Sequence, residues 1–129
     1  MWYLSVPFLL AGIMHIFCAG IAKYGRKDFD NHHPRQWMSK FDGYRARANA
    51  AQANTLESLP FFYASALFAL YMQVDYQGLA CLLWIWIICR VVYIYAYIKD
   101  MATFRSIVWF VALCVNITLL FSASFFPAL

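Results

Sequence analysis

The stretch WYLSVPFLLAGIMHIFCAGIA (residues 2–22) contains no charged residue, and its length decides the class of fold. A helix needs about 20 consecutive apolar residues to cross the hydrocarbon core of a bilayer. A secretory signal peptide would instead begin with basic residues and have a shorter apolar region, whereas residues 1–4 contain neither Lys nor Arg. We therefore expect a permanent membrane-spanning helix here.

Three more apolar runs follow. Ser106–Leu129 has no charge, Ala48–Val74 has only Glu57, and Tyr76–Ile98 has only Arg90. Of the 129 residues, 64% are hydrophobic and 12% are charged, whereas soluble domains have roughly 25% charged residues. The sequence thus predicts an all-α integral membrane protein, a single-domain four-helix bundle of up-down topology with helices at about residues 3–24, 44–73, 76–99 and 105–126.

The basic residues predict the orientation in the membrane. They occur in two places, between the first two helices and around the connection between the last two: Lys23, Arg26, Lys27, Arg35, Lys40, Arg45 and Arg47, then Arg90, Lys99 and Arg105. By the positive-inside rule both connections lie in the cytoplasm, so both termini are non-cytoplasmic. This bias accounts for the net charge of +4, and no nucleic-acid partner is expected.

Polar side chains at membrane depth are the candidates for function, because ionisable groups there are costly. Asn54 and Glu57 are three residues apart and share one helix face, and Arg90, Tyr93 and Tyr97 share a face of the next helix. One interpretation is that Glu57 and Arg90 simply pair and lock two helices together. That pairing does not explain the further polar groups Arg47, Gln52 and Arg105, and such a surplus of donors suits an anionic ligand with several carboxylates.

Two blocks of sequence resemble a known family. They are RARANAAQANTLESLP (residues 45–60), with Asn54-x-x-Glu57-x-x-Pro60 at its centre, and RVVYIYAY (residues 90–97), followed by Arg105-Ser106. Both are similar to motifs of the MAPEG family, the membrane-associated proteins of eicosanoid and glutathione metabolism. The length, the four helices and the basic first connection agree, so the resemblance covers essentially the whole chain.

The resemblance implies a bacterial-type member in the inner membrane, a homotrimer that binds glutathione between subunits near the cytoplasmic side. It implies that Gln52, Asn54 and Glu57 contact the peptide and that Arg90, Tyr93 and Tyr97 line the same pocket. It also implies that Arg105 stabilises the thiolate beside Ser106, and that Arg26 or Lys27 adds a basic contact. Many members have an Arg four residues before the Asn, where this chain has Ala50. Arg47 lies one turn earlier on the same face and is the expected substitute.

The function expected from this resemblance is a glutathione transferase or peroxidase. Its thiolate would attack apolar electrophiles or lipid hydroperoxides that arrive from the lipid. A non-enzymatic lipid-binding or scaffold protein of the same fold is the open alternative, because a fold does not imply a function. A channel is disfavoured, because the polar residues gather at one end.

The remaining polar residues support weaker expectations. The loop Asp28–His33 fits no recognised metal spacing, so no metal is predicted. His15 and Asn116 are expected to form hydrogen bonds between helices. The four cysteines lie in apolar runs and are expected to behave as small hydrophobic residues.

Overall fold

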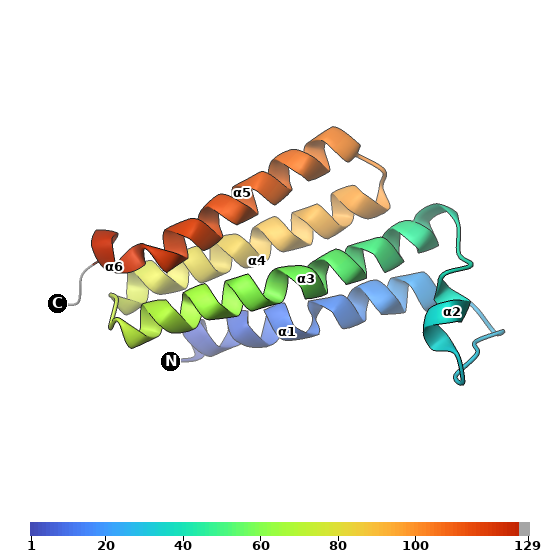
Figure 1. Cartoon of the computed structure of the whole chain (residues 1–129), viewed down its shortest axis with the longest axis horizontal. Coiled ribbons are helices and arrows are strands. Elements are labelled where there is room, and N and C mark those ends of the chain that lie inside the picture. Colours follow the sequence, from blue (N-terminus) through green and yellow to red (C-terminus); the bar gives the residue numbers. More distant parts are fainter. Residues whose placement is uncertain (127–129) are drawn as a thin grey trace.

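The computed structural model describes residues 1–126, which form six helices. Four of them are long and lie side by side, and two are short (Figure 1): α1 (Trp2–Lys23), α2 (Pro34–Met38), α3 (Gly43–Tyr71), α4 (Tyr76–Ile98), α5 (Ala102–Leu120) and α6 (Ser122–Phe125). The C-terminal Leu129, for which the sequence predicts a side of the membrane, lies outside the described residues.

Three of the described helices, α1, α4 and α5, are long and apolar enough to cross a membrane. The fourth long helix, α3, has 29 residues and would extend about 43 Å at 1.5 Å per residue. Its first half is polar and its second half is apolar. Large apolar side chains are exposed along the outer faces of all four, where lipid can replace a protein interior. The chain is therefore an all-α integral membrane protein.

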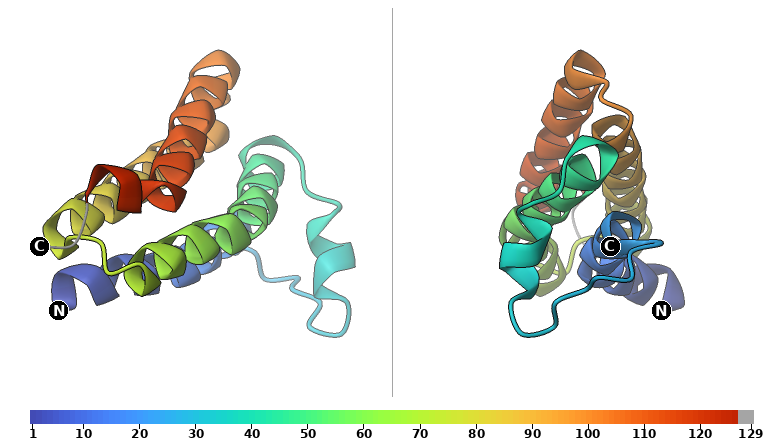
Figure 2. Two further views of the ribbon diagram at one scale, coloured as in Figure 1. Left: turned by 60° about the vertical axis from the view of Figure 1, so that its left-hand side comes forward. Right: turned by 90° about the vertical axis from the view of Figure 1, so that its right-hand side faces the viewer.

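The long helices pack as two pairs. α1 lies mainly on α3 and α4 mainly on α5, and contacts of α3 with α4 and α5 join the pairs. As a result α1 and α5 lie on opposite sides of the bundle (Figure 2). The core at the centre includes Phe62 of α3, whose ring stacks on Trp86 of α4 at 3.9 Å between centroids and 17° between planes. This arrangement leaves one face of α5 toward α3, where the polar residues of both helices meet.

Pro7 of α1 creates a contact between α1 and α4. Proline has no backbone N–H, so the carbonyl of Tyr3, four residues earlier, lacks its usual donor within the helix. The indole Nε1 of Trp84 in α4 donates to this carbonyl at 3.1 Å. The carbonyl that Pro7 leaves without a donor thus accepts a hydrogen bond from α4, which joins α1 and α4.

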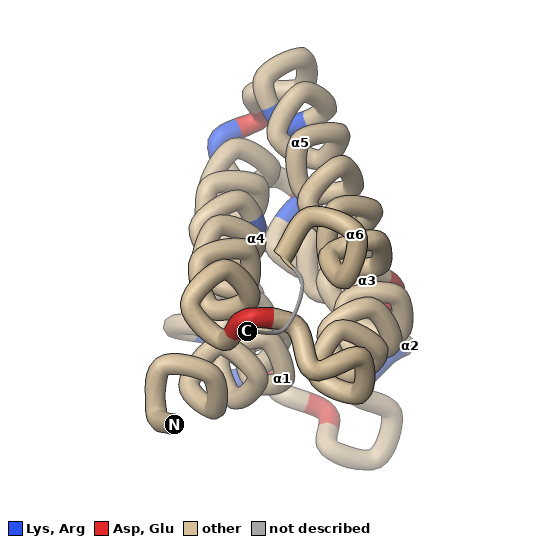
Figure 3. Tube along the Cα trace, turned by 90° about the vertical axis from the view of Figure 1, so that its left-hand side faces the viewer, with Lys and Arg blue, Asp and Glu red and all other residues tan. Residues whose placement is uncertain are grey.

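The basic segments gather at one end. Residues 24–42 and the turn at residues 99–101 lie together at the end opposite to the turn between α3 and α4 (Figure 1). Seen from that latter turn, most Lys and Arg positions lie in the distant part of the molecule (Figure 3). At the basic end, Arg45 Nη1 donates to the carbonyl of Ala22 at 2.8 Å, and Arg47 Nε donates to that of Ile98 at 2.9 Å. Two arginines at the start of α3 therefore cap the C-terminal ends of α1 and α4, where a positive charge is favourable.

The helix bounds differ from the sequence-based ones mainly in two places. α5 begins at Ala102 instead of 105 and breaks at Phe121, after which α6 begins. The expected polar loop at residues 25–43 contains the short helix α2, which has Pro34 at its first turn, a favourable position for proline. Trp37 and Met38 of α2 are buried against the ends of α1 and α3, a contact that no periodic pattern predicted.

Candidate functional site

A polar cleft lies between α3, α4 and α5 toward the basic end. We call it the outer cleft; it has a volume of about 240 Å³ and is lined by Asn54, Tyr93, Tyr97, Arg105, Ser106 and Trp109. The first residue comes from α3, the tyrosines come from α4, and the last three come from α5. Five of these six residues are among the sequence-predicted site residues, and the fold brings them together from three helices.

Two arginines and two tyrosines form a continuous series of ring contacts, of which Tyr93, Tyr97 and Arg105 line this cleft. The guanidinium carbon of Arg90 lies 4.3 Å from the centroid of the Tyr93 ring, and that of Arg105 lies 4.2 Å from the Tyr97 ring. The two rings meet edge to face at 5.7 Å. Cation–π contacts of this kind are worth about 0.5–2 kcal/mol and fix the plane of the guanidinium. The tyrosines therefore hold both arginines in place without neutralising their charge.

Arg90 is buried without an acidic partner. It is 1% exposed, and its Nη2 donates to Asn54 Oδ1 at 3.0 Å and to Thr55 Oγ1 at 3.3 Å. No atom of the described part of the chain accepts from its Nε. The interpretation that Glu57 and Arg90 form a locking ion pair is therefore wrong. Instead a neutral amide and a hydroxyl solvate the cation, which leaves its positive charge available to a ligand.

A second cavity, which we call the inner chamber, adjoins the outer cleft and shares two lining residues with it. It has a volume of about 220 Å³ and is lined by Asn54, Glu57, Ser58, Phe61, Trp86, Arg90, Trp109, Ala112, Leu113 and Asn116. Asn54 and Trp109 line both cavities. Five of the ten lining residues are apolar and five are polar or charged, and apolar walls with convergent polar groups are typical of ligand sites.

Glu57 lines the inner chamber from α3. Glu57 is exposed, and it forms no salt bridge among the described residues. A carboxylate without a cation on the outer surface of a membrane helix is costly unless a ligand, water or a neighbouring subunit provides a partner. Glu57 is thus the negative group of a site whose positive groups are Arg90 and Arg105.

Arg26, the fourth predicted arginine, belongs to a different cluster. Lys23, Tyr24, Gly25 and Arg26 form a tight turn in which Gly25 has φ +73°, and the Arg26 N–H donates to the Lys23 carbonyl at 3.0 Å. Glycine suits this conformation because it has no Cβ. The turn directs the Arg26 side chain toward Asp28.

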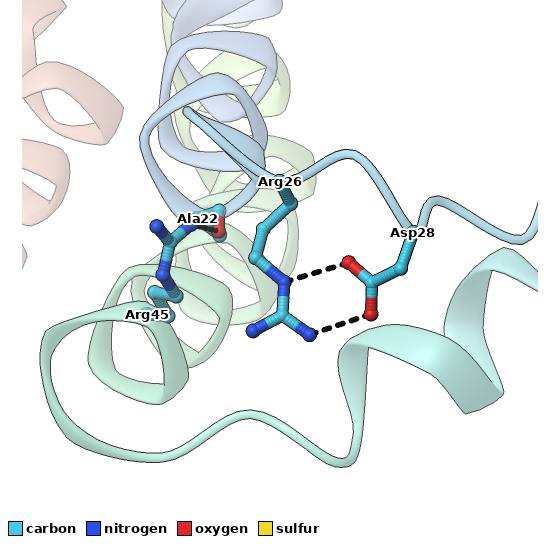
Figure 4. Close-up of polar contacts among 4 residues, drawn as sticks. All are labelled: Ala22, Arg26, Asp28 and Arg45. Carbon is cyan, nitrogen blue, oxygen red and sulfur yellow. Dashed lines mark hydrogen bonds and ion pairs between the residues drawn. The ribbon is translucent and has the colours of Figure 1, made fainter.

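The Arg26 guanidinium forms a two-fold contact with Asp28, from Nε to Oδ1 at 2.8 Å and from Nη2 to Oδ2 at 2.7 Å (Figure 4). These hydrogen bonds hold the pKa of the Asp28 carboxyl below its usual value and raise the pKa of Arg26. The guanidinium also lies over the rings of Trp37 and Phe41, at 5.9 and 5.4 Å. Arg26 is thus engaged within the first connection and does not line either cavity.

Two further predicted residues also lie outside the cavities. Arg47, the expected substitute for the arginine missing at Ala50, donates to Ile98 instead. Gln52 is half-buried, and because it precedes Asn54 by two positions it lies on nearly the opposite face of α3. Within one subunit, neither contributes to the walls of the outer cleft or the inner chamber.

The sequence analysis did not predict that Trp109, Ser58 and Asn116 line the site. Positions 105, 109, 112 and 116 are spaced by four, three and four residues, so the face that carries Arg105 also carries Trp109 and Asn116, a signal present in the sequence. The expectation that Asn116 and His15 form hydrogen bonds between helices is wrong in this structure. Asn116 Oδ1 and His15 Nδ1 are buried and have no partner among the described residues, and an unpartnered polar group costs about 1–3 kcal/mol.

The described residues contain no group of three or more His, Cys, Asp or Glu side chains arranged to hold a metal ion. Cys18 is buried, Cys89 is partly buried, Cys81 and Cys114 are exposed, and all four are free.

One of three comparisons with known proteins gives a match. No curated protein and no solved structure matches the chain. The family model described as MAPEG family matches residues 3–125, nearly the whole chain, and spans every residue of both cavities. This family includes glutathione transferases and related membrane proteins. Because the match covers nearly the whole chain, and because the chain has membrane helices with a site where three of them meet, the chain belongs to the MAPEG family.

Proposed function

We propose that this protein is a membrane-embedded glutathione transferase or peroxidase whose thiolate forms in the outer cleft and attacks apolar electrophiles or lipid hydroperoxides. The observation that carries the proposal is the convergence of seven predicted site residues on two connected cavities: Asn54, Glu57, Arg90, Tyr93, Tyr97, Arg105 and Ser106. They come from three helices, so chance clustering along one helix does not account for it.

The charges of these cavities suit glutathione. At neutral pH the tripeptide carries carboxylates, an ammonium group and a thiol. Among residues 1–126, Arg90 and Arg105 have no acidic partner, and Glu57 has no basic one. Charge-assisted hydrogen bonds to such groups are roughly twice as strong as neutral ones. A glutathione carboxylate would bind Arg90, its thiolate would lie at Arg105, and its ammonium would bind Glu57.

Arg105 would supply the chemistry. A thiol with a pKa near 8.5 is mostly protonated at pH 7, and a guanidinium close to the sulfur favours the thiolate. Arginine suits this role because it does not give up its own proton. The Tyr97 ring fixes the Arg105 fork, and Ser106, whose Oγ donates to the Ala102 carbonyl at 3.1 Å, can instead turn its hydroxyl toward the sulfur.

We propose a homotrimer in which glutathione lies between subunits. Glu57, Phe61 and Trp109 line the inner chamber and are exposed in one subunit, and an exposed carboxylate at membrane depth is costly. A cyclic assembly removes that cost by covering this face. Gln52, Arg47 and Arg26 point away from their own cavities, so any contact they make with glutathione would be with that of a neighbour.

The site would open to the cytoplasm. The outer cleft lies toward the end that carries the basic segments, and the positive-inside rule places those segments in the cytoplasm. Four spans with both termini non-cytoplasmic follow, with α3 as the fourth span, and the bacterial inner membrane is the proposed location. The first half of α3 would project beyond the bilayer and carry Arg45 and Arg47.

One observation favours the alternative, a lipid-binding member without catalysis. An apolar groove on the outer face of α1 is lined by Ile16, Phe17, Gly20, Ile21, Tyr24 and Tyr44. Its volume is about 460 Å³, enough for part of an acyl chain. The groove lies on the opposite side of the bundle from α5, so lipid binding there is compatible with catalysis in the cleft.

Glutathione binding decides between these functions. Isothermal titration of the purified protein should give saturable binding in the millimolar range or tighter, with one site per subunit. Arg35→Ala is the matched control, since Arg35 is an exposed basic residue outside both cavities, and it should leave the binding unchanged. No saturable binding would favour the lipid-binding protein. Native mass spectrometry in mild detergent should show trimers, and monomers alone would contradict the assembly.

A further inference from the structure

The groove on the outer face of α1 contains one glycine, Gly20, between bulky apolar residues. Ile16, Phe17 and Ile21 line the groove beside it, and a Cβ added at Gly20 would meet no atom within 4 Å. Glycine inside a helix costs roughly 0.5–1 kcal/mol relative to alanine, so helix stability does not account for its presence here. Gly20 leaves an open notch on the helix surface, in which an acyl chain can lie close to the backbone.

Two tyrosines line the end of this groove that is nearest to the basic segments. Tyr24 directly follows α1, and Tyr44 lies in the first turn of α3. Tyrosine is enriched where a membrane meets water, because its ring is apolar and its hydroxyl is polar. The groove thus runs from the apolar Ile16 to a polar interface, over about 12 Å of helix at 1.5 Å per residue.

A half-buried arginine, Arg45, lies at this polar end. Its guanidinium carbon is 5.1 Å from the centroid of the Tyr44 ring, and its Nη1 donates to the Ala22 carbonyl at 2.8 Å (Figure 4). Both contacts fix the guanidinium, and neither neutralises it. No carboxylate among residues 1–126 forms a salt bridge with it. The charge of Arg45 is therefore available to an anion.

The surroundings of Arg45 are also positive. Residues 22–28 and 42–45, which meet at this end of the groove, contain four basic side chains and two carboxylates, and one of the carboxylates, Asp28, is paired with Arg26. Each Lys or Arg near an anionic membrane surface contributes about 1 kcal/mol of attraction. A headgroup with a net negative charge is therefore favoured here over a zwitterionic one.

We propose that this groove binds one anionic phospholipid of the leaflet that faces the basic end, with an acyl chain in the notch at Gly20 and the phosphate at Arg45. The lipid would contact α1 and the start of α3 together. The groove shares no lining residue with the outer cleft or the inner chamber, so the site is separate from the one proposed for glutathione. The proposal needs no glutathione and does not rest on the proposed function.

The headgroup is tested by native mass spectrometry of the purified protein in mild detergent. Dioleoyl phosphatidylglycerol should bind about tenfold more tightly than dioleoyl phosphatidylcholine, since the chains are the same and one charge-assisted contact differs. Arg45→Met should remove this preference. Arg35→Met is the matched control, because Arg35 is an exposed basic residue of α2 outside the groove, and it should keep the preference.

The notch is tested by Gly20→Leu, which fills it. The new side chain meets no atom where its Cβ is placed, so we expect this variant to fold normally. It should bind both lipids about tenfold more weakly, because the acyl chain loses its place against the helix. Ala64→Leu adds the same bulk at an exposed position of α3 outside the groove and should leave the binding of both lipids unchanged.

Gly20→Leu also keeps the proposal testable if Arg45→Met does not fold, since Arg45 holds the end of α1 as well. Equal affinity of the wild-type protein for the two lipids would overturn the headgroup assignment. Unchanged lipid binding in Gly20→Leu would overturn the acyl-chain assignment. If that variant instead lost its subunit association while lipid binding stayed the same, the groove would be covered by a second copy of the chain, which also contradicts the proposal.

Discussion

Arg105 of α5 stacks on Tyr97 of α4, with its guanidinium carbon 4.2 Å from the ring centroid, and has no acidic partner among the described residues. A carboxylate partner would neutralise this cation and compete with any anionic ligand. An aromatic face fixes the guanidinium and leaves its charge uncompensated. The contact with Tyr97 therefore keeps the Arg105 guanidinium in place and available to bind an anion.

Arg105→Ala should raise the pKa of the bound glutathione thiol and lower kcat by roughly ten- to a hundredfold, because one charge-assisted contact worth about 1.5–3 kcal/mol is lost. Arg105→Lys should recover only part of the rate, since a flexible ammonium replaces a fixed fork. The measurement is thiolate absorbance of bound glutathione against pH, together with turnover. Arg35→Ala is the control, and an unchanged titration in Arg105→Ala would make Arg105 an anchor at the membrane surface.

Glu57→Gln should show the opposite pattern. We expect it to weaken glutathione binding by about tenfold while the rate of the bound complex changes little, because Glu57 would hold the ammonium group and not the sulfur. Titration calorimetry gives the affinity, and single-turnover kinetics give the bound-state rate. Equal affinity in the two proteins would show that the ammonium binds elsewhere.

Arg90→Met should separate function from stability. Replacing a buried charge that has no acidic partner by an apolar side chain of similar length removes the cost of desolvating that charge, which offsets the loss of its hydrogen bonds to Asn54 and Thr55. We therefore expect the thermal midpoint not to fall, while glutathione affinity falls by about ten- to a hundredfold. Leu83→Ala, a buried position on the same helix, is the control that should lower the midpoint by leaving a cavity. A large fall in Arg90→Met would mean that Arg90 stabilises the fold.

The Asp28 carboxyl should titrate below its usual range. A pKa lowered in the folded state means that the contact stabilises the first connection fully above the ordinary value of about 3.9 and is lost as pH falls through the lowered one. Carbon NMR of the Asp28 carboxyl should show this value rise in Arg26→Gln. In Arg35→Gln it should stay unchanged, and an equal shift in both variants would indicate a general charge effect.

Topology follows from the basic segments. A reporter joined before Met1 and a reporter inserted at Asn31 should lie on opposite sides of the membrane, with the second in the cytoplasm. An insertion at Gln73, between α3 and α4, should report the same side as Met1. Reporters that agree at all three sites would contradict an up-down arrangement of the helices.

Much of the fold follows from the sequence alone, for a local reason. An uncharged run of sufficient length must satisfy its backbone hydrogen bonds within itself when it enters lipid, and a helix does this without partners. The apolar runs that start at Trp2 and Tyr76 therefore predict helices, independently of the helices that pack beside them. Helical periodicity likewise placed Asn54 with Glu57, and Arg90 with Tyr97, on common faces.

What only the tertiary structure decided is which face meets which neighbour, and hence which partner each polar group finds. Arg26, Arg47 and Arg105 are equivalent in sequence, being basic residues near a helix end, yet Arg26 contacts Asp28, Arg47 caps α4 and Arg105 enters the cleft. Asn116 is an ordinary polar residue in an apolar run until the packing of α5 on α3 encloses it without a partner. Spacing along one helix determines the faces of that helix, whereas contacts between helices depend on the packing of every side chain between them.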